Sequence, residues 1–116
     1  MEAMNGLLRL KRPPTAVCCY NDMTALSAIR AIREGGLRVP ADVSVTGFDD
    51  LFFAAYLAPA LTTVRHPMRR MGQMAMENLF KLMSGQESIA QIKVWAELIV
   101  RESTGKAPKR GRHHGR

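Results

Sequence analysis

Hydrophobic residues recur at two spacings in the first half of the chain, one typical of strands and one of helices. Residues 16–20 (AVCCY) suit a strand that is buried on both faces of a parallel sheet, and residues 43–47 (VSVTG) form a second run typical of a strand. Between them, apolar residues fall at helical spacing over 23–32, after an N-cap residue, Asn21, and before the glycine pair at 35–36. The sequence therefore predicts a βαβ unit with two parallel strands.

The flanking segments extend this alternation. An apolar stripe over residues 1–8 predicts a short helix that the proline pair at 13–14 must end, and residues 61–64 predict a third, brief strand. A longer stripe over 67–84 predicts another helix, and alternating apolar and polar residues over 92–101 predict a half-buried final strand. Strands that alternate with helices predict an α/β fold.

Two apolar surfaces lack an obvious partner in this scheme. The helix over 67–84 has a broad apolar face with few partners among the predicted elements, which indicates that part of a larger domain is missing. Residues 51–57 carry no charge and follow two aspartates. They belong either to the core or to a subunit interface, and the sequence does not distinguish the two.

Charge is distributed unevenly along the chain. The 116 residues carry a formal net charge of +7, but a cluster of lysines and arginines lies in residues 105–116, so residues 1–104 are nearly neutral. We expect 105–116 to be a disordered basic tail that could contact nucleic acid without sequence preference.

Three features of the sequence are typical of a cytoplasmic protein. The apolar runs are far shorter than the roughly 20 residues of a membrane-spanning helix, and we expect no membrane association. The two cysteines, Cys18 and Cys19, are adjacent and should point to opposite faces of a strand, so a disulfide between them is not expected. No secretory signal pattern opens the sequence, and we therefore expect a reducing compartment.

Polar residues follow the first two predicted strands. Asn21 follows the first strand and Asp49-Asp50 follow the second, and the carboxyl ends of parallel strands lie at one edge of a sheet. An amide beside a carboxylate can bind the hydroxyls of a sugar or the ring nitrogens of a nucleobase. The alternative is structural: Asn21 as a helix N-cap and the aspartates as turn residues.

Catalytic and metal chemistry is disfavoured. The aspartate pair has no further carboxylate or lysine at another strand end to complete a metal or phosphoacceptor site, and the sequence has no nucleophile elbow. His66 precedes a proline and is typical of a cap or surface residue. His113 and His114 lie in the basic tail, where a metal site would be poor. We expect no enzyme activity and no cofactor.

A set of short motifs strongly resembles the effector-sensing domain of the LacI/GalR family of bacterial transcriptional repressors. The resemblance runs from about residue 3 to residue 104. It rests on Pro14-Thr15-Ala16-Val17, Asn21-Asp22-Met23, Gly36-Leu37-Arg38-Val39-Pro40, Gly47-Phe48-Asp49-Asp50, Leu61-Thr62-Thr63-Val64, Met71-Gly72 and Val100-Arg101-Glu102-Ser103-Thr104.

This resemblance implies a periplasmic-binding-protein-like domain of two α/β lobes, with a small-molecule effector in the cleft between them. The effector is usually a sugar or sugar derivative, and sometimes a purine. Full-length members are dimers that bind operator DNA through an N-terminal helix-turn-helix. The implied site residues are Asn21, Asp49, His66 and Met68 for the effector, and Leu26, Arg30 and Tyr56 for dimerisation.

Against the family pattern the chain is an incomplete domain. Residues 1–104 correspond mainly to the C-terminal lobe, and the helix over 67–84 belongs on the missing first lobe. We therefore expect the effector-binding and dimerisation portion of a LacI/GalR-type regulator, with operator DNA as a partner only through the absent N-terminal domain. Two alternatives stay open: a fragment of a periplasmic sugar-binding transport protein, and a dimerisation module or remnant without a ligand of its own.

Overall fold

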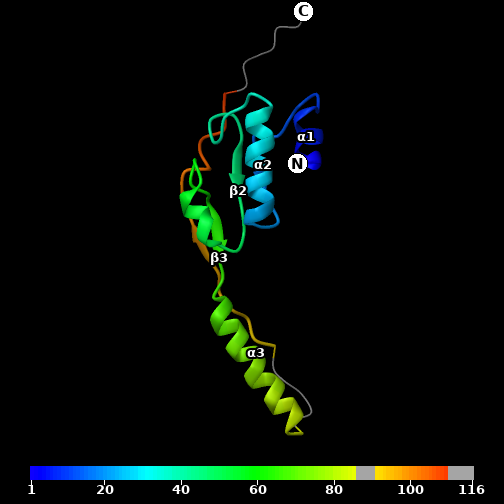
Figure 1. Cartoon of the computed structure of the whole chain (residues 1–116), viewed down its shortest axis with the longest axis vertical. Coiled ribbons are helices and arrows are strands. Elements are labelled where there is room, and N and C mark those ends of the chain that lie inside the picture. Colours follow the sequence, from blue (N-terminus) through cyan, green and yellow to red (C-terminus); the bar gives the residue numbers. More distant parts are fainter. Residues whose placement is uncertain (86–90, 110–116) are drawn as a thin grey trace, which may run out of the picture.

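Helices and strands alternate along the residues that the structure, a computed structural model, describes: 1–85 and 91–109. Figure 1 shows the α/β arrangement that the sequence predicts. In chain order the elements are α1 (Glu2–Leu8), β1 (Ala16–Cys18), α2 (Asp22–Glu34), β2 (Ser44–Thr46), the 3-10 helix η1 (Phe52–Tyr56), β3 (Thr63–Arg65), α3 (Met68–Met83) and β4 (Glu97–Ile99).

The predicted βαβ unit is confirmed. β1 pairs with β2 in parallel, with Val17 opposite Val45, and α2 connects the two strands. The other edge of β2 meets the start of β3 through a parallel bridge between Thr46 and Thr62. Because β1, β2 and the start of β3 run in one direction, their carboxyl ends lie at one edge of the sheet.

The core lies between α2 and the strands. The inner face of α2 is buried together with Val43, Val45 and Leu61. Met4 of α1 is also buried and belongs to the same hydrophobic cluster. Both predicted ends of α2 are confirmed. The Asn21 carboxamide oxygen accepts the Thr24 N–H at 2.8 Å, and at the far end Gly36 adopts a φ of +77°.

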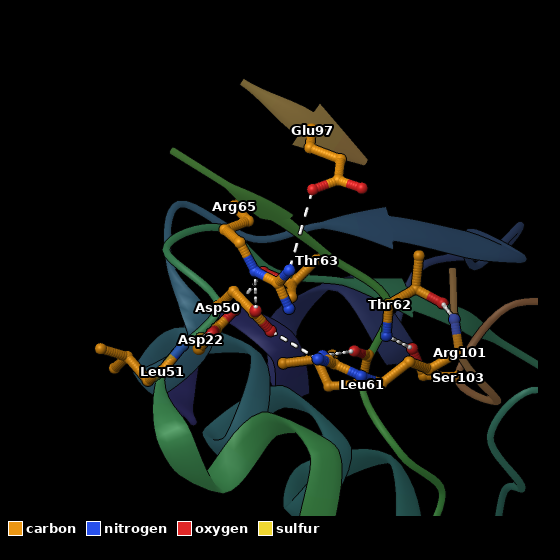
Figure 2. A network of polar contacts seen from close by, with 10 residues as sticks. All are labelled: Asp22, Asp50, Leu51, Leu61, Thr62, Thr63, Arg65, Glu97, Arg101 and Ser103. Carbon is orange, nitrogen blue, oxygen red and sulfur yellow. Dashed lines mark hydrogen bonds and ion pairs between the residues drawn. The ribbon is translucent and has the colours of Figure 1, made fainter. Parts of the chain in front are cut away.

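Residues 100–105, here called the C-terminal strap, lie between β2 and β3 upstream of the Thr46 bridge. The Ser103 hydroxyl donates to the Val45 carbonyl at 2.6 Å and accepts the Thr62 N–H at 2.8 Å. The Val45 N–H donates to the Ser103 carbonyl at 2.9 Å. The strap therefore connects β2 to the residue before β3. Figure 2 shows its contacts with Thr62.

Two sequence predictions about strand burial are wrong. β1 is shorter than predicted, and Ala16 and Cys18 are exposed, because no other described element covers its outer face. The final strand was expected over 92–101, but only β4 forms, antiparallel to β3, and Leu98 on its expected inner face is 62% exposed. Residues 91–96 instead run beside α3 (Figure 1).

α3 projects away from the sheet. The molecule measures 73 × 27 × 23 Å, and α3 accounts for one end of the long axis (Figure 1). None of its residues is buried. The unpartnered apolar face that the sequence predicts is therefore present, with exposed Met68, Met71, Met76, Leu79, Phe80, Leu82 and Met83.

Three further sequence expectations concern the cysteines, membrane-spanning helices and the basic tail. Both cysteines are free, and burial raises the pKa of the Cys19 thiol above its usual value. Within the described ranges, no helix combines the length and apolar character needed to cross a membrane. Residues 110–116 of the predicted tail lie outside the described residues, whereas Gly105 still donates its N–H to the Ser44 hydroxyl at 3.1 Å.

Replacement of Gly47 by alanine tests the packing of α2 against the sheet. The new Cβ would overlap the Asp22 carboxylate and lie 2.9 Å from Leu61 Cδ2. We expect the free energy of unfolding in urea to fall by about 1–3 kcal/mol, the usual cost of overpacking. In the control, Gly6→Ala in α1 meets nothing within 4 Å and should raise stability by up to about 1 kcal/mol. Equal stability of Gly47→Ala and wild type would contradict this packing.

Candidate functional site

A buried carboxylate, Asp22, lies directly under the edge of the sheet where the strands end. It is the first residue of α2 and is 0% exposed. One carboxylate oxygen accepts the Thr63 hydroxyl at 2.6 Å, and the other accepts the Leu51 N–H at 2.7 Å. Because both oxygens are hydrogen-bonded, the cost of burying the charge is reduced. Asp22 thereby joins α2, β3 and the loop after β2 (Figure 2).

The loop after β2 carries two aspartates with left-handed backbones. Asp49 has a φ of 105° and Asp50 a φ of 52°. Such conformations are costly for residues other than glycine and persist only where the surroundings hold them. Here the Asp49 N–H donates to the Val64 carbonyl at 2.9 Å, and the Asp22 hydrogen bond fixes Leu51, the next residue after the pair. The loop is thus held at both sides.

Asp50 lies between two arginines. Its side chain is 8% exposed, and its oxygens accept from Arg101 and from Arg65, each at 2.6 Å. Arg101 also donates to the Leu61 carbonyl at 2.8 Å, and Arg65 lies 3.7 Å from Glu97 (Figure 2). Burial acts to raise the pKa of Asp50, but hydrogen bonds and charge from Arg101 and Arg65 outweigh it, so the pKa lies below its ordinary value.

Three of the four sequence-predicted ligand residues line one open hollow of about 580 Å³ at this edge. They are Asp49, His66 and Met68. The complete lining is Asp49, Asp50, Arg65, His66, Pro67, Met68, Arg69, Arg70 and Gln73. The loop after β2, the end of β3 and the first turns of α3 therefore build the hollow together.

His66 is half-buried in this hollow rather than a surface residue or a helix cap. Its Nε2 lies 3.0 Å from an Asp49 oxygen, and its ring stacks on Phe48 with 5.4 Å between centroids. Its Nδ1 is buried, and no group of the described residues hydrogen-bonds to it. A second hollow of about 370 Å³, lined by Tyr20, Phe48 and Asp49, adjoins the first through Asp49. Carboxylate, imidazole and aromatic ring together suit a small polar ligand.

Asn21, the fourth predicted ligand residue, does not line either hollow. Its side-chain oxygen accepts both the N–H and the hydroxyl of Thr24, at 2.8 Å each, so the N-cap interpretation is confirmed. It still lies at the same edge of the sheet, because the neighbouring Asp22 N–H donates to the Phe48 carbonyl at 2.9 Å.

The residues expected at a dimer interface are all on the surface. Leu26 is 37% exposed and Tyr56 is 85% exposed, and Arg30 forms an exposed ion pair with Glu34. Residues 51–57 are not all part of the core, since Ala54 is buried while Phe52 is 85% exposed.

Within residues 1–85 and 91–109, no group of three His, Cys, Asp or Glu side chains is arranged to hold a metal ion. The sequence did not single out Asp22, Arg65 or Arg101 as site residues. The sequence does contain a signal that Asp22 is buried. Asp22 lies one helical turn before Ala25, so the two side chains share the apolar, buried face of α2.

A family model described as a periplasmic binding protein-like domain matches residues 1–104. The chain belongs to this family. Among curated proteins, the transcriptional repressor PurR of Proteus mirabilis is 44% identical over 108 residues, covering 92% of this chain and 32% of the repressor. The probable transcriptional repressor ExuR of Bacillus subtilis is 45% identical over 103 residues, covering 88% and 31% respectively. The chain thus spans about a third of the length of these relatives.

Solved structures of this family show the same fold. The Lac repressor dimer bound to operator and the anti-inducer ONPF has a TM-score of 0.80 and 37% identity, with 89% of this chain and 36% of that chain covered. A LacI transcriptional regulator from a Rhodococcus species has a TM-score of 0.81 and 30% identity, with 93% and 40% covered. The resemblance to LacI/GalR regulators is confirmed, and so is the incomplete periplasmic-binding-protein-like fold.

The pKa of Asp50 predicts a pH dependence of stability. The ordinary pKa of an aspartate, which applies in the unfolded chain, is about 3.9. Because the folded-state pKa is lower, the stabilisation from Asp50 is fully present above about pH 4 and is lost as the pH falls through the folded pKa. The stability difference between wild type and Asp50→Asn, measured by urea unfolding, should therefore be nearly constant from about pH 6 to pH 4 and shrink as the pH falls from about pH 4 to pH 3.

The control is Gly6→Ala, which changes no ionisable group. Its stability difference from wild type should stay nearly constant over the same range. A wild-type advantage over Asp50→Asn that is equally large in acid would contradict the lowered pKa.

Proposed function

We propose that this chain is the effector-binding and dimerisation portion of a LacI/GalR-type transcriptional regulator. It binds a small molecule, a sugar or sugar derivative, and ligand binding controls the affinity of the intact protein for operator DNA. The intact protein acts in the cytoplasm, binds DNA through a separate N-terminal domain, and performs no catalytic step. The relatives support this proposal, because they are transcriptional repressors.

One observation carries the ligand-binding part of the proposal: Asp49, His66 and Met68 converge on one hollow at the carboxyl ends of the strands. Open α/β sheets bind ligands at this position. The Asp49 carboxylate accepts hydrogen bonds from ligand hydroxyls, His66 offers a second polar group, and Met68 an adaptable apolar contact. Asn21, at the same edge, offers its carboxamide N–H groups, since only its oxygen is used by the cap.

The geometry also supports a cleft with a second wall. The hollow is open, and α3, which borders it, buries none of its residues. In the proposed intact protein a second lobe covers α3 and closes over the ligand. Closure that depends on the ligand gives two states with different ligand affinity, which is what coupling to operator binding requires.

The dimerisation part rests on a separate surface. Leu26, Arg30 and Tyr56 lie on the exposed sides of α2 and η1, away from the lining of the hollow. We place a homodimer interface there. In this arrangement two chains associate without blocking their ligand sites.

The experiment is a chimera in which this chain replaces the matching stretch of the Proteus mirabilis repressor, to which it is 44% identical. Operator binding is measured with and without a panel of sugars, sugar derivatives and purines, and sedimentation gives the oligomeric state. A dimer whose operator affinity changes with one member of the panel supports the proposal. A folded chimera that is monomeric, or whose operator affinity responds to no member, contradicts it.

Substitutions at the site then test the residue roles. For the ligand that the panel identifies, Asp49→Ala and Asn21→Ala should each weaken binding by about 1–3 kcal/mol, the cost of leaving a buried polar group without its partner. Calorimetry of the chimera measures the affinity. The matched control, Glu34→Gln, removes an exposed carboxylate at the far end of α2 and should leave the affinity unchanged. Unchanged affinity in both site variants would remove the site assignment.

A further inference from the structure

Basic side chains from two segments far apart in the sequence gather at one end of the molecule. This group, here called the basic end, consists of Arg9, Lys11 and Arg12 after α1, and Lys106 and Lys109 after the C-terminal strap. All five side chains are exposed. Among the described residues, none of the five forms an ion pair.

Ser44, at the start of β2, brings the two segments together. Its N–H donates to the Thr15 carbonyl at 2.9 Å, and its hydroxyl accepts the Gly105 N–H at 3.1 Å. Arg12 lies three residues before Thr15, and Lys106 follows the strap directly. The backbone therefore limits both to roughly 10 Å from these contacts. Figure 1 shows both segments at the end of the long axis opposite α3, away from the second lobe that the proposed function places over α3.

The acidic side chains near the amino ends of the strands already have partners. Glu34, at the end of α2, is paired with Arg30, and Asp42, before β2, is paired with Arg38. The Glu102 carboxylate accepts a backbone N–H at 3.1 Å. Within the described part of the chain, no carboxylate pairs with the basic end, so its positive charge faces the solvent.

We propose that the basic end binds the phosphate backbone of duplex DNA without reading its sequence. Guanidinium and ammonium groups bind phosphate oxygens through charge-assisted hydrogen bonds and release the counterions that surround DNA. The sequence indicates residues 105–116 alone for such a contact, and the fold adds residues 9–12 to it. This contact is distinct from the operator-binding domain in the proposed function, and it does not depend on the ligand of the hollow.

The composition of the basic end favours duplex DNA over two other anionic partners. Proteins hold single-stranded nucleic acid by stacking its bases on aromatic rings, and residues 9–12 and 105–109 contain none. Anionic membranes are bound by basic residues together with large apolar side chains that insert between lipids, and Leu10 is the one exposed side chain of this kind in the two segments. Duplex DNA requires neither, since its phosphates lie on the outside at about one charge per 1.7 Å of helix axis.

The test is fluorescence anisotropy with the full 116-residue chain and two labelled DNA duplexes of unrelated sequence, each about 20 base pairs long. We expect the two duplexes to bind with the same Kd to within about twofold. The Kd should rise about tenfold or more as the salt concentration rises from about 50 mM to 200 mM. A Kd that does not depend on salt, or a strong preference for one duplex, would overturn the proposal.

Variants in each segment assign the contact to the basic end. Lys11→Gln/Arg12→Gln and Lys106→Gln/Lys109→Gln should each raise the Kd about fivefold or more at low salt. Each should also reduce the slope of log Kd against log salt by about 2, because each side chain contributes about one phosphate contact. Wild-type affinity and slope in both double variants would contradict the assignment.

The matched control is Lys81→Gln/Lys93→Gln, which removes two exposed lysines at the other end of the molecule, on α3 and beside it. Its Kd should stay within about twofold of the wild-type value. If the control weakens DNA binding as much as the other variants do, the net charge of the chain attracts DNA and the basic end is not a site.

Two further probes separate the partners at equal phosphate concentration: a single-stranded oligonucleotide and vesicles of phosphatidylglycerol. Tighter binding of the duplex than of either probe supports the proposal, and tighter binding of either probe refutes the choice of duplex DNA. If the chain binds no DNA, this inference fails and the proposed function is unaffected, because the ligand response of the chimera tests that function separately.

Discussion

The buried carboxylate of Asp22 is the constraint on which the rest of the site depends. It starts α2, accepts from Thr63 of β3 and from the Leu51 N–H, and lies so close to Gly47 that no side chain fits there. A buried charge must have its hydrogen bonds made within the protein. Meeting that requirement fixes the Leu51 end of the loop that carries Asp49 and Asp50 and ties it to β3, and so helps to determine where the polar edge of the sheet lies.

The second constraint comes from the far end of the sequence. Ser103 completes the sheet between Val45 and Thr62, and Arg101 reaches Asp50 across 51 positions of the chain. The loop after β2 is therefore held by Asp22 on one side and by Arg101 with Arg65 on the other. Local backbone strain at two left-handed aspartates is maintained by these distant partners. The result is a rigid rim beside an open, ligand-sized hollow.

The sequence predicted those features that are encoded locally. Helical spacing, Asn21 as a cap and the glycine pair at 35–36 act within one or two turns, so α2 and the βαβ unit could be predicted. The burial of β1 and of residues 92–101 could not, because it depends on which element covers a strand, and periodicity does not contain that information. The Asp22 and Asp50 networks were missed for the same reason, since their partners are brought together only by the fold. Asp49, His66 and Met68 were predicted through the family resemblance, and the structure brings them together.

Hydrogen exchange in the Asp22→Asn variant tests the central claim most directly, namely that one buried carboxylate holds the polar edge of the sheet. Asn retains one acceptor and loses the other, so the amides of Asp49 and Leu51 should open and exchange about tenfold or more faster. The Val45 N–H donates to the Ser103 carbonyl and does not contact Asp22, so it should keep its protection from exchange. Protection at Val45 serves as the control that the sheet is intact. Wild-type exchange rates at Asp49 and Leu51 in a folded Asp22→Asn variant would contradict the account.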